Sequence, residues 1–190
     1  MAPANRLRRS QRERLRATED LLATKIQTRD HFAVTPEQFW DEVFFDETYN
    51  QKLYTDALGF TGLDIQKMEG GPGEARHRVM VAEPKSEMPA VMKKIVGNSL
   101  AYTETGPFDP KTGSWTYRVV TNKVGDKVKI GGKLWCEPKG DDGCIRIAEV
   151  EIEVKIFGVG GTIEKFIEKQ TRESYEKTAT FTNQWIAERA

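Results

Sequence analysis

The C-terminal part of the chain constrains the fold most, because a one-sided strand is followed there by a long helix. Apolar residues alternate with charged ones from Glu149 to Ile156, which is the pattern of a strand with one wet face and one apolar face. Gly158, Gly160 and Gly161 then allow a tight reversal. Residues 162–188 contain no Gly or Pro and predict a helix far longer than the average of about 11–12 residues. A sheet with one apolar face needs such a helix as its cover.

Upstream of this pair, short runs with period-two alternation are separated by turn signals, and the short links between them predict antiparallel neighbours. The strands are predicted over 24–34, 63–68, 76–82, 100–105, 114–122, 127–136 and 144–156. A short helix is predicted to open at Pro36, because the Thr35 hydroxyl can cap its first amides and Gln38 stands three residues after that cap. Two further helices are predicted over 47–58 and 87–96.

The charge balance gives no global attraction to nucleic acid or to an anionic membrane, since Lys+Arg and Asp+Glu both number 29. No apolar run approaches the ~20 residues that span a bilayer, and the N-terminus lacks the apolar core of a secretory signal. A cytoplasmic protein that binds no nucleic acid is therefore expected. Cys136 and Cys144 are too few for a disulfide framework and lack partners at zinc-site spacing, so we expect reduced thiols, no metal and no cofactor.

Residues 1–22 form a basic segment with little to bury, so we expect a helical or flexible extension there and a domain over 23–190. The segment contains Arg6, Arg8, Arg9, Arg12, Arg14 and Arg16. One hypothesis is a weak anchor for acidic lipid headgroups, through Arg6, Arg8, Arg9 and Arg12, or for nucleic acid. The alternative, a solvated extension, is favoured because short basic tails are common and the rest of the chain is neutral.

The order of the predicted elements resembles the START-like superfamily, also called SRPBCC, with its helix-grip fold. The most recognisable pieces are VKIFGVGGTIEKFIEKQ, from Val154 to Gln170, and FTNQWI, from Phe181 to Ile186. The resemblance covers roughly residues 24–189 and is nearest to a bacterial family of unknown function. It implies an α+β fold in which a curved antiparallel sheet wraps around a long C-terminal helix, with an apolar cavity between them.

Candidate cavity residues follow from the strand faces expected to point inward and from the middle of the long helix. Trp115 and Tyr117 would bring large rings with polar tips to that face. Gln170 and Ser174 interrupt the apolar stripe of the helix, either because they face a ligand or because they meet buried water or rings across the core. The candidates are His77, Val79, Met92, Tyr102, Trp115, Tyr117, Ile152, Phe166, Gln170 and Ser174.

The favoured hypothesis is a carrier or sensor that binds a hydrophobic small molecule, lipid-like or aromatic, between the sheet and the helix. A cyclase or dehydratase is the first alternative, with His77, Tyr117 and Gln170 orienting a substrate. No catalytic motif supports it, and a structural role for His77 is favoured over a catalytic one. The second alternative, implied by co-chaperone relatives in the superfamily, is a protein-interaction module with a filled core.

Overall fold

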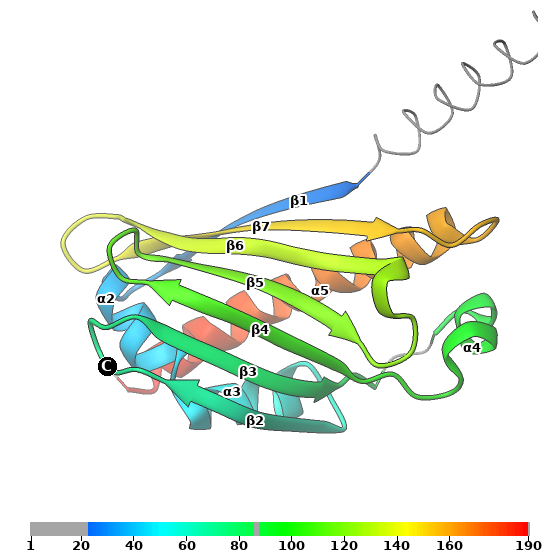
Figure 1. Cartoon of the computed structure of the whole chain (residues 1–190). Helices are drawn as coiled ribbons and strands as arrows, with labels where there is room; N and C mark the ends of the chain where they lie inside the picture. The colour runs from blue at the N-terminus through cyan, green and yellow to red at the C-terminus, as the bar shows by residue number, and fades with distance from the viewer. Residues whose placement is uncertain (1–22, 86–87, 190) are drawn as a thin grey trace, which may run out of the picture.

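The computed structural model describes residues 23–85 and 88–189 (Figure 1). The extension predicted over 1–22, with its hypothesised contacts through Arg6, Arg8, Arg9 and Arg12, lies outside the described residues. The strands are β1 (Thr24–Phe32), β2 (Gly62–Glu69), β3 (Arg76–Glu83), β4 (Tyr102–Asp109), β5 (Ser114–Thr121), β6 (Val128–Pro138) and β7 (Cys144–Val154). The helices are α2 (Pro36–Gln38), η1 (Phe39–Phe44), α3 (Glu47–Lys52), η2 (Leu53–Ala57), α4 (Ala90–Val96), η3 (Gly125–Lys127) and α5 (Gly160–Ala187).

Seven strands form one antiparallel sheet in the order β1-β7-β6-β5-β4-β3-β2. Strands β2 to β7 follow one another as a meander, and β1 pairs with β7 at the edge. The sheet curves around α5, which crosses its inner face (Figure 1). This arrangement confirms the predicted α+β helix-grip fold, and the strands and helices occur in the predicted order.

The two ends of α5 pack in different clusters. Near its start, Ile163 packs with Met92 of α4 and is 3% exposed. Near its end, Trp185 and Ile186 join the main aromatic core. Between these ends the inward residues of α5 are only partly buried, which leaves space between the helix and the sheet. Within residues 23–85 and 88–189, no helix is both long enough and apolar enough to cross a membrane.

The first helix begins as the sequence predicts. The Thr35 hydroxyl accepts a hydrogen bond from the Gln38 amide at 3.3 Å, and the Gln38 side-chain oxygen accepts one from the Thr35 amide at 3.0 Å. This capping box satisfies two amides that a helix start otherwise leaves without partners. The helix then continues as the π-helical turn η1, whose Phe39 stacks on Phe32 with ring centroids 5.5 Å apart. The cap therefore fixes the position at which the chain enters the aromatic core.

Replacing Thr35 with alanine is expected to lower the free energy of unfolding by about 1 kcal/mol, because the Gln38 amide loses its acceptor. Urea unfolding followed by circular dichroism measures the change. Thr55→Ala is the control. The Thr55 hydroxyl is exposed, lies 2.8 Å from the Gln51 carbonyl and 2.7 Å from Asp56 Oδ1, and caps no helix start, so its loss is expected to contribute little. Equal losses in the two variants would contradict the role given to the cap.

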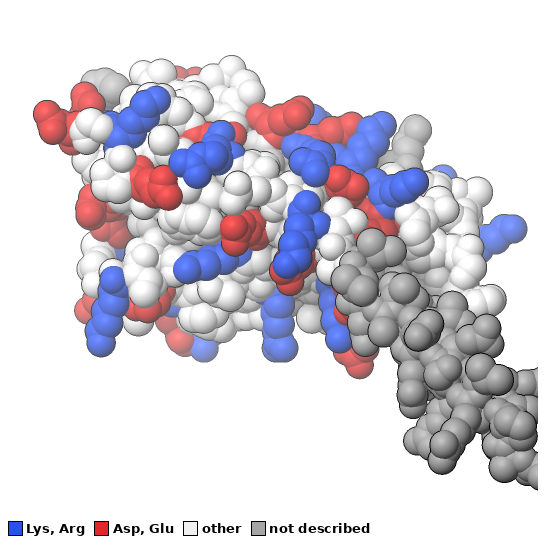
Figure 2. All heavy atoms as spheres, turned by 90° about the horizontal axis from the view of Figure 1, so that it is seen from above, with Lys and Arg blue, Asp and Glu red and all other residues white. Residues whose placement is uncertain are grey.

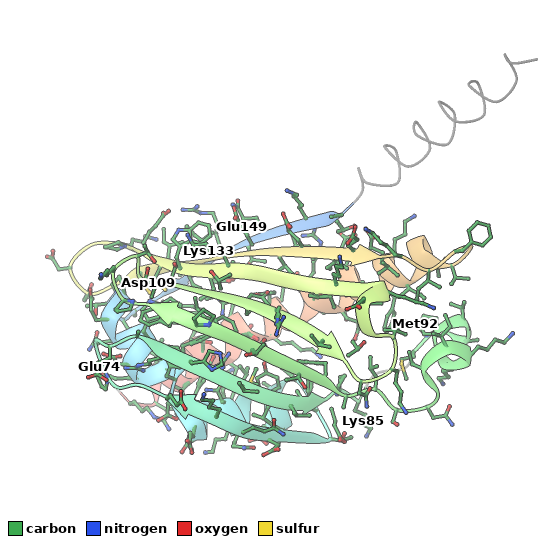
Figure 3. All side chains as sticks on the ribbon, in the orientation of Figure 1. Glu74, Lys85, Met92, Asp109, Lys133 and Glu149 are labelled. Atoms are coloured by element: carbon green, nitrogen blue, oxygen red, sulfur yellow. The ribbon has the colours of Figure 1, made fainter. Side chains whose placement is uncertain are left out.

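The outer surface over β1, β7 and β6 is a mixed-charge surface (Figure 2). Lys25 of β1 forms an ion pair with Glu151 of β7 at 2.9 Å, and Gln27 donates to Glu149 at 3.0 Å. Lys133 of β6 stands opposite Glu149 in the register, and both side chains are exposed (Figure 3). These are solvated cross-strand pairs, which leaves the opposite face of the same strands to build the interior.

The predicted bounds of one strand were wrong. The pattern placed a strand over 100–105 and a turn from Pro107, whereas β4 runs from Tyr102 to Asp109 and contains Pro107. Proline lacks an amide donor and is normally excluded from the middle of a sheet. Here the described ladder between β4 and β5 pairs no residue with Gly106 or Pro107 and resumes at Phe108, so the missing donor coincides with an interruption of the ladder.

Candidate functional site

A cavity of about 300 Å³ lies between the inner face of the sheet and α5. Its wall includes side chains from every strand of the sheet between β3 and β7, from the helical segments between Phe39 and Leu58, and from α4 and α5. The two ends of this cavity differ in chemistry. We call them the α4 end and the arginine end, after the residues that form them.

The α4 end is apolar. It is formed by Met88, Met92, Val96, Ile156, Ile163 and Phe166. Met88, Met92, Val96 and Ile163 are each buried and pack as one cluster, separate from the main core. Helix α4 lies at this end of the domain, and its Met92 packs with Ile163 near the start of α5 (Figure 3). Methionine side chains adapt to irregular neighbours, so this end suits an apolar group of variable shape.

The arginine end contains two buried guanidinium groups, and Arg78 of β3 is the first. Its Nη2 donates to Glu104 Oε1 of β4 at 2.9 Å, and the two side chains are 3% and 11% exposed. Its Nη1 donates to the Phe44 carbonyl at 3.1 Å and to Asn50 Oδ1 at 3.2 Å. The guanidinium also lies over the Trp115 ring, 4.7 Å from its centroid. Burial raises the pKa of Glu104, and the Arg78 charge acts in the opposite direction.

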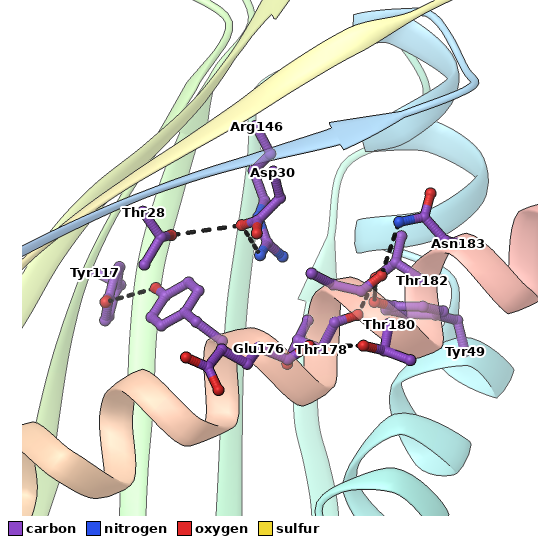
Figure 4. A network of polar contacts seen from close by, with 12 residues as sticks. Thr28, Asp30, Tyr49, Tyr117, Arg146, Glu176, Thr178, Thr180, Thr182 and Asn183 are labelled. Atoms are coloured by element: carbon purple, nitrogen blue, oxygen red, sulfur yellow. Dashed lines mark hydrogen bonds and ion pairs between the residues drawn. The ribbon is translucent and has the colours of Figure 1, made fainter.

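Arg146 of β7 is the second buried cation (Figure 4). Its Nη2 donates to Asp30 of β1 at 2.6 Å, and the two side chains are 4% and 17% exposed. The guanidinium lies between the Phe32 and Tyr175 rings, 5.2 Å and 5.3 Å from their centroids. Asp30 also lies within 3.5 Å of the Thr28 hydroxyl. The carboxylate therefore comes from the edge strand and lies behind the arginine, whose side chain reaches the cavity wall.

All five tyrosines of the chain contribute to the wall of this cavity. They are Tyr49, Tyr54, Tyr102, Tyr117 and Tyr175. The hydroxyls of Tyr117 and Tyr175 are 3.3 Å apart, and that of Tyr49 is 2.6 Å from the Thr182 hydroxyl (Figure 4). Burial raises the pKa of each of the five phenols above its ordinary value. All five therefore remain protonated at neutral pH and can donate hydrogen bonds.

Most of the predicted cavity residues are brought together. The wall includes Met92, Tyr102, Trp115, Tyr117, Phe166, Gln170 and Ser174, and also Thr178 from the same helix face. Ile152 does point inward, but it is fully buried and packs against Ile26 and Val150 instead of lining the space. It supports the wall from behind.

The placement of His77 and Val79 in the cavity was wrong. On β3 the buried residues are Arg76, Arg78, Met80 and Ala82, so His77 and Val79 lie on the outer face. His77 Nε2 lies 3.4 Å from the Thr105 hydroxyl of the neighbouring strand. The sequence pattern predicted the reverse, with Val79 and Val81 facing inward and the arginines of β3 facing outward, because arginine side chains are rarely buried. The arginines can be buried because each forms an ion pair with a carboxylate: Asp41 pairs with Arg76 and Glu104 with Arg78.

Sequence reasoning missed the charged half of the cavity. Arg78, Glu104 and Arg146 were absent from the predicted site, although each lies on the same parity as residues that form the inner face. One signal was available for Asp30, which shares the inward parity of Ile26 and Phe32 in β1. A charged residue in an inward position of one strand indicates that an opposite charge lies nearby in another.

The comparisons with known proteins agree with this architecture. A family model described as "Protein of unknown function (DUF2505)" matches residues 27–186, and no curated protein matches the chain. An aromatase/cyclase from Streptomyces sp. R1128 is similar at 13% identity and a TM-score of 0.60, over 87% of this chain and 96% of that one. A START superfamily protein from Mycobacterium smegmatis is similar at 13% identity and a TM-score of 0.54, over 85% and 98%.

A third similar structure is norcoclaurine synthase from Thalictrum flavum in complex with dopamine and hydroxybenzaldehyde. It is 19% identical, has a TM-score of 0.60, and the match covers 89% of each chain. At identities this low the three structures establish the START-like fold and nothing finer. The predicted resemblance to the superfamily, and to a family of unknown function, is confirmed.

Proposed function

The chain belongs to the DUF2505 family of proteins of unknown function, and we propose that it binds a hydrophobic small molecule, lipid-like or aromatic, between the sheet and α5, as a carrier or sensor. One observation carries this proposal: α5 packs tightly at its two ends and leaves a cavity of about 300 Å³ between them. Ligand pockets span roughly 300–1,000 Å³ and bury most of the ligand surface. A compact ligand would gain its affinity there from buried apolar area.

The similar structures support the proposal. One of them holds dopamine and hydroxybenzaldehyde, so a protein of this fold can bind small aromatic molecules. The alternative of a cyclase or dehydratase had His77, Tyr117 and Gln170 orient a substrate. Tyr117 and Gln170 line the cavity, whereas His77, the acid or base of that hypothesis, lies on the outer face of β3. The alternative of a protein-interaction module required a filled core, and the cavity of about 300 Å³ does not agree with a filled core. Binding is therefore the function that the arrangement favours.

Native mass spectrometry of the purified chain, followed by solvent extraction, is the experiment that tests the proposal directly. The expected result is a bound hydrophobic compound at a stoichiometry near one, or, for a chain purified without it, binding of the neutral fluorescent probe N-phenylnaphthylamine. A chain that carries no compound and gives no fluorescence change with the probe would contradict the proposal.

Ser174→Phe is expected to weaken binding of N-phenylnaphthylamine by at least about tenfold, since a ring added at this wall position fills the space that the ligand would occupy. Fluorescence titration measures the dissociation constant. Lys177→Phe is the matched control on the same helix, because Lys177 is exposed and does not line the cavity. If both variants bind as tightly as the wild type, the ligand lies elsewhere.

A further inference from the structure

The two ends of the cavity differ in polarity. At the α4 end, Met92, Val96 and Ile163 present only hydrocarbon and thioether groups. At the arginine end, two guanidiniums and the tyrosine hydroxyls converge from β3, β7, β5, α3 and α5. Both arginines are linked by a row of contacting rings: Arg146 lies over Tyr175, whose hydroxyl is 3.3 Å from that of Tyr117, and Tyr117 stacks on Trp115, over which Arg78 lies. They therefore act on one shared region and not on two unrelated parts of the wall.

Hydrogen-bond donors outnumber acceptors at the arginine end. Each guanidinium carries five N–H donors, whereas Glu104 is the carboxylate that faces them from the wall. Arg78 donates to three acceptors and Arg146 to one, Asp30. The two guanidiniums therefore carry more N–H donors than these acceptors take up, so the region complements a group that brings further acceptors.

We propose that the ligand is an amphiphile whose acceptor oxygens, in a carbonyl or carboxylate group, lie against Arg78 and Arg146, and whose apolar body extends toward α4. This inference rests on the proposed function and adds the polarity and orientation of the ligand to it. A cationic head is disfavoured, because the carboxylates at this end, Glu104 and Asp30, are already paired with the two guanidiniums. A hydrogen bond to a charged donor discriminates more strongly than a neutral one, so the head decides affinity among ligands with equal tails.

The test uses the full chain and a set of probes with the same tail: decanoic acid, methyl decanoate, decane and decylamine, each displacing N-phenylnaphthylamine. Decanoic acid or its methyl ester is expected to bind at least about tenfold more tightly than decylamine. The acid and the ester distinguish a carboxylate from a neutral carbonyl as the preferred head. Decylamine that binds as tightly as both would overturn the inference, while the proposed function would stand. A chain that carries no compound and does not bind N-phenylnaphthylamine would instead refute the proposed function itself.

A pair of double variants tests whether the polar head of the ligand lies against Arg78. In R78M/E104M both members of the buried ion pair are removed together, so no lone charge is left behind. The affinity ratio of the preferred probe to decylamine is expected to fall to near one. K133M/E149M is the matched control, since it removes an opposed Lys and Glu from the outer face of β6 and β7 and should leave that ratio unchanged. An unchanged ratio in R78M/E104M would contradict the placement of the head.

A second variant tests the orientation without touching a buried charge. Val124 is half-buried beside the α4 end, in the link between β5 and β6, so a larger residue can be accommodated there. Val124→Trp is expected to weaken decanoic acid more than hexanoic acid, because only the longer tail would reach this end. If hexanoic acid is weakened as much as decanoic acid, the head lies near α4 and the inference is wrong.

Discussion

Replacing Arg78 alone with methionine is expected to lower the free energy of unfolding by about 3–5 kcal/mol, the range for breaking a buried ion pair by removing one partner. The variant leaves Glu104 in the interior without its cation, with a side chain that is 11% exposed. It also leaves Asn50 Oδ1 and the Phe44 carbonyl without the donor that now serves them. Urea unfolding at neutral pH, monitored by tryptophan fluorescence, measures the loss.

The control for this loss is R78M/E104M, which is expected to be much less destabilised than the single variant, because the two charges leave together. The pH dependence has a defined sign. Burial raises the pKa of Glu104 in the folded chain, so the folded state binds a proton at this carboxyl more tightly than the unfolded state does. The stability gained from that protonation is lost as the pH rises through the folded-state pKa. Without Arg78 the pKa of Glu104 rises further, so at about pH 5 this carboxyl is more often neutral and less costly to bury. The loss of unfolding free energy in the single variant should therefore be smaller at about pH 5 than at about pH 8. An equal penalty at both would show that Glu104 is not the cause.

The architecture could be predicted because its signals are local and repeated. The alternation in β1 and β7, the cap at Thr35 and the helix-length segment after Gly161 each depend on neighbouring residues. Errors appeared where local pattern and tertiary packing disagree. Pro107 predicts a turn, yet it lies within β4, because the ladder between β4 and β5 is interrupted at this residue.

The cavity was predicted only in its apolar and aromatic half, for a physical reason. Hydrophobicity decides which face of a strand is buried, except where charged residues are buried in pairs. On β3, Val79 and Val81 gave the apolar pattern, while the buried positions hold Arg76 and Arg78. Such pairing joins strands far apart in the sequence, as Asp30 and Arg146 show, so no local window contains both members. Recognising inward charges therefore required the sheet register.

The second large effect is expected at Gly132 of β6, which stands opposite Tyr117 in the register. A Cβ atom at this glycine would lie 2.1 Å from the Glu149 carbonyl oxygen and 3.0 Å from the Tyr117 hydroxyl. The first of these neighbours is backbone, so it cannot give way without moving β7. Gly132→Ala is therefore expected to lower the free energy of unfolding by about 3 kcal/mol, at the upper end of typical overpacking costs. Thermal and urea unfolding both measure it.

Gly161→Ala is the matched control for Gly132→Ala. Gly161 lies in the first turn of α5, and a Cβ atom there would have no neighbour within 4 Å. That substitution is expected to raise stability by about 0.4–1 kcal/mol, because alanine loses less backbone entropy than glycine on folding. The ring of Tyr117 also lines the cavity, so a chain that tolerates Gly132→Ala should bind N-phenylnaphthylamine with altered affinity. Wild-type stability and affinity in Gly132→Ala would mean that Tyr117 and β7 are not held in the positions from which the cavity wall is built.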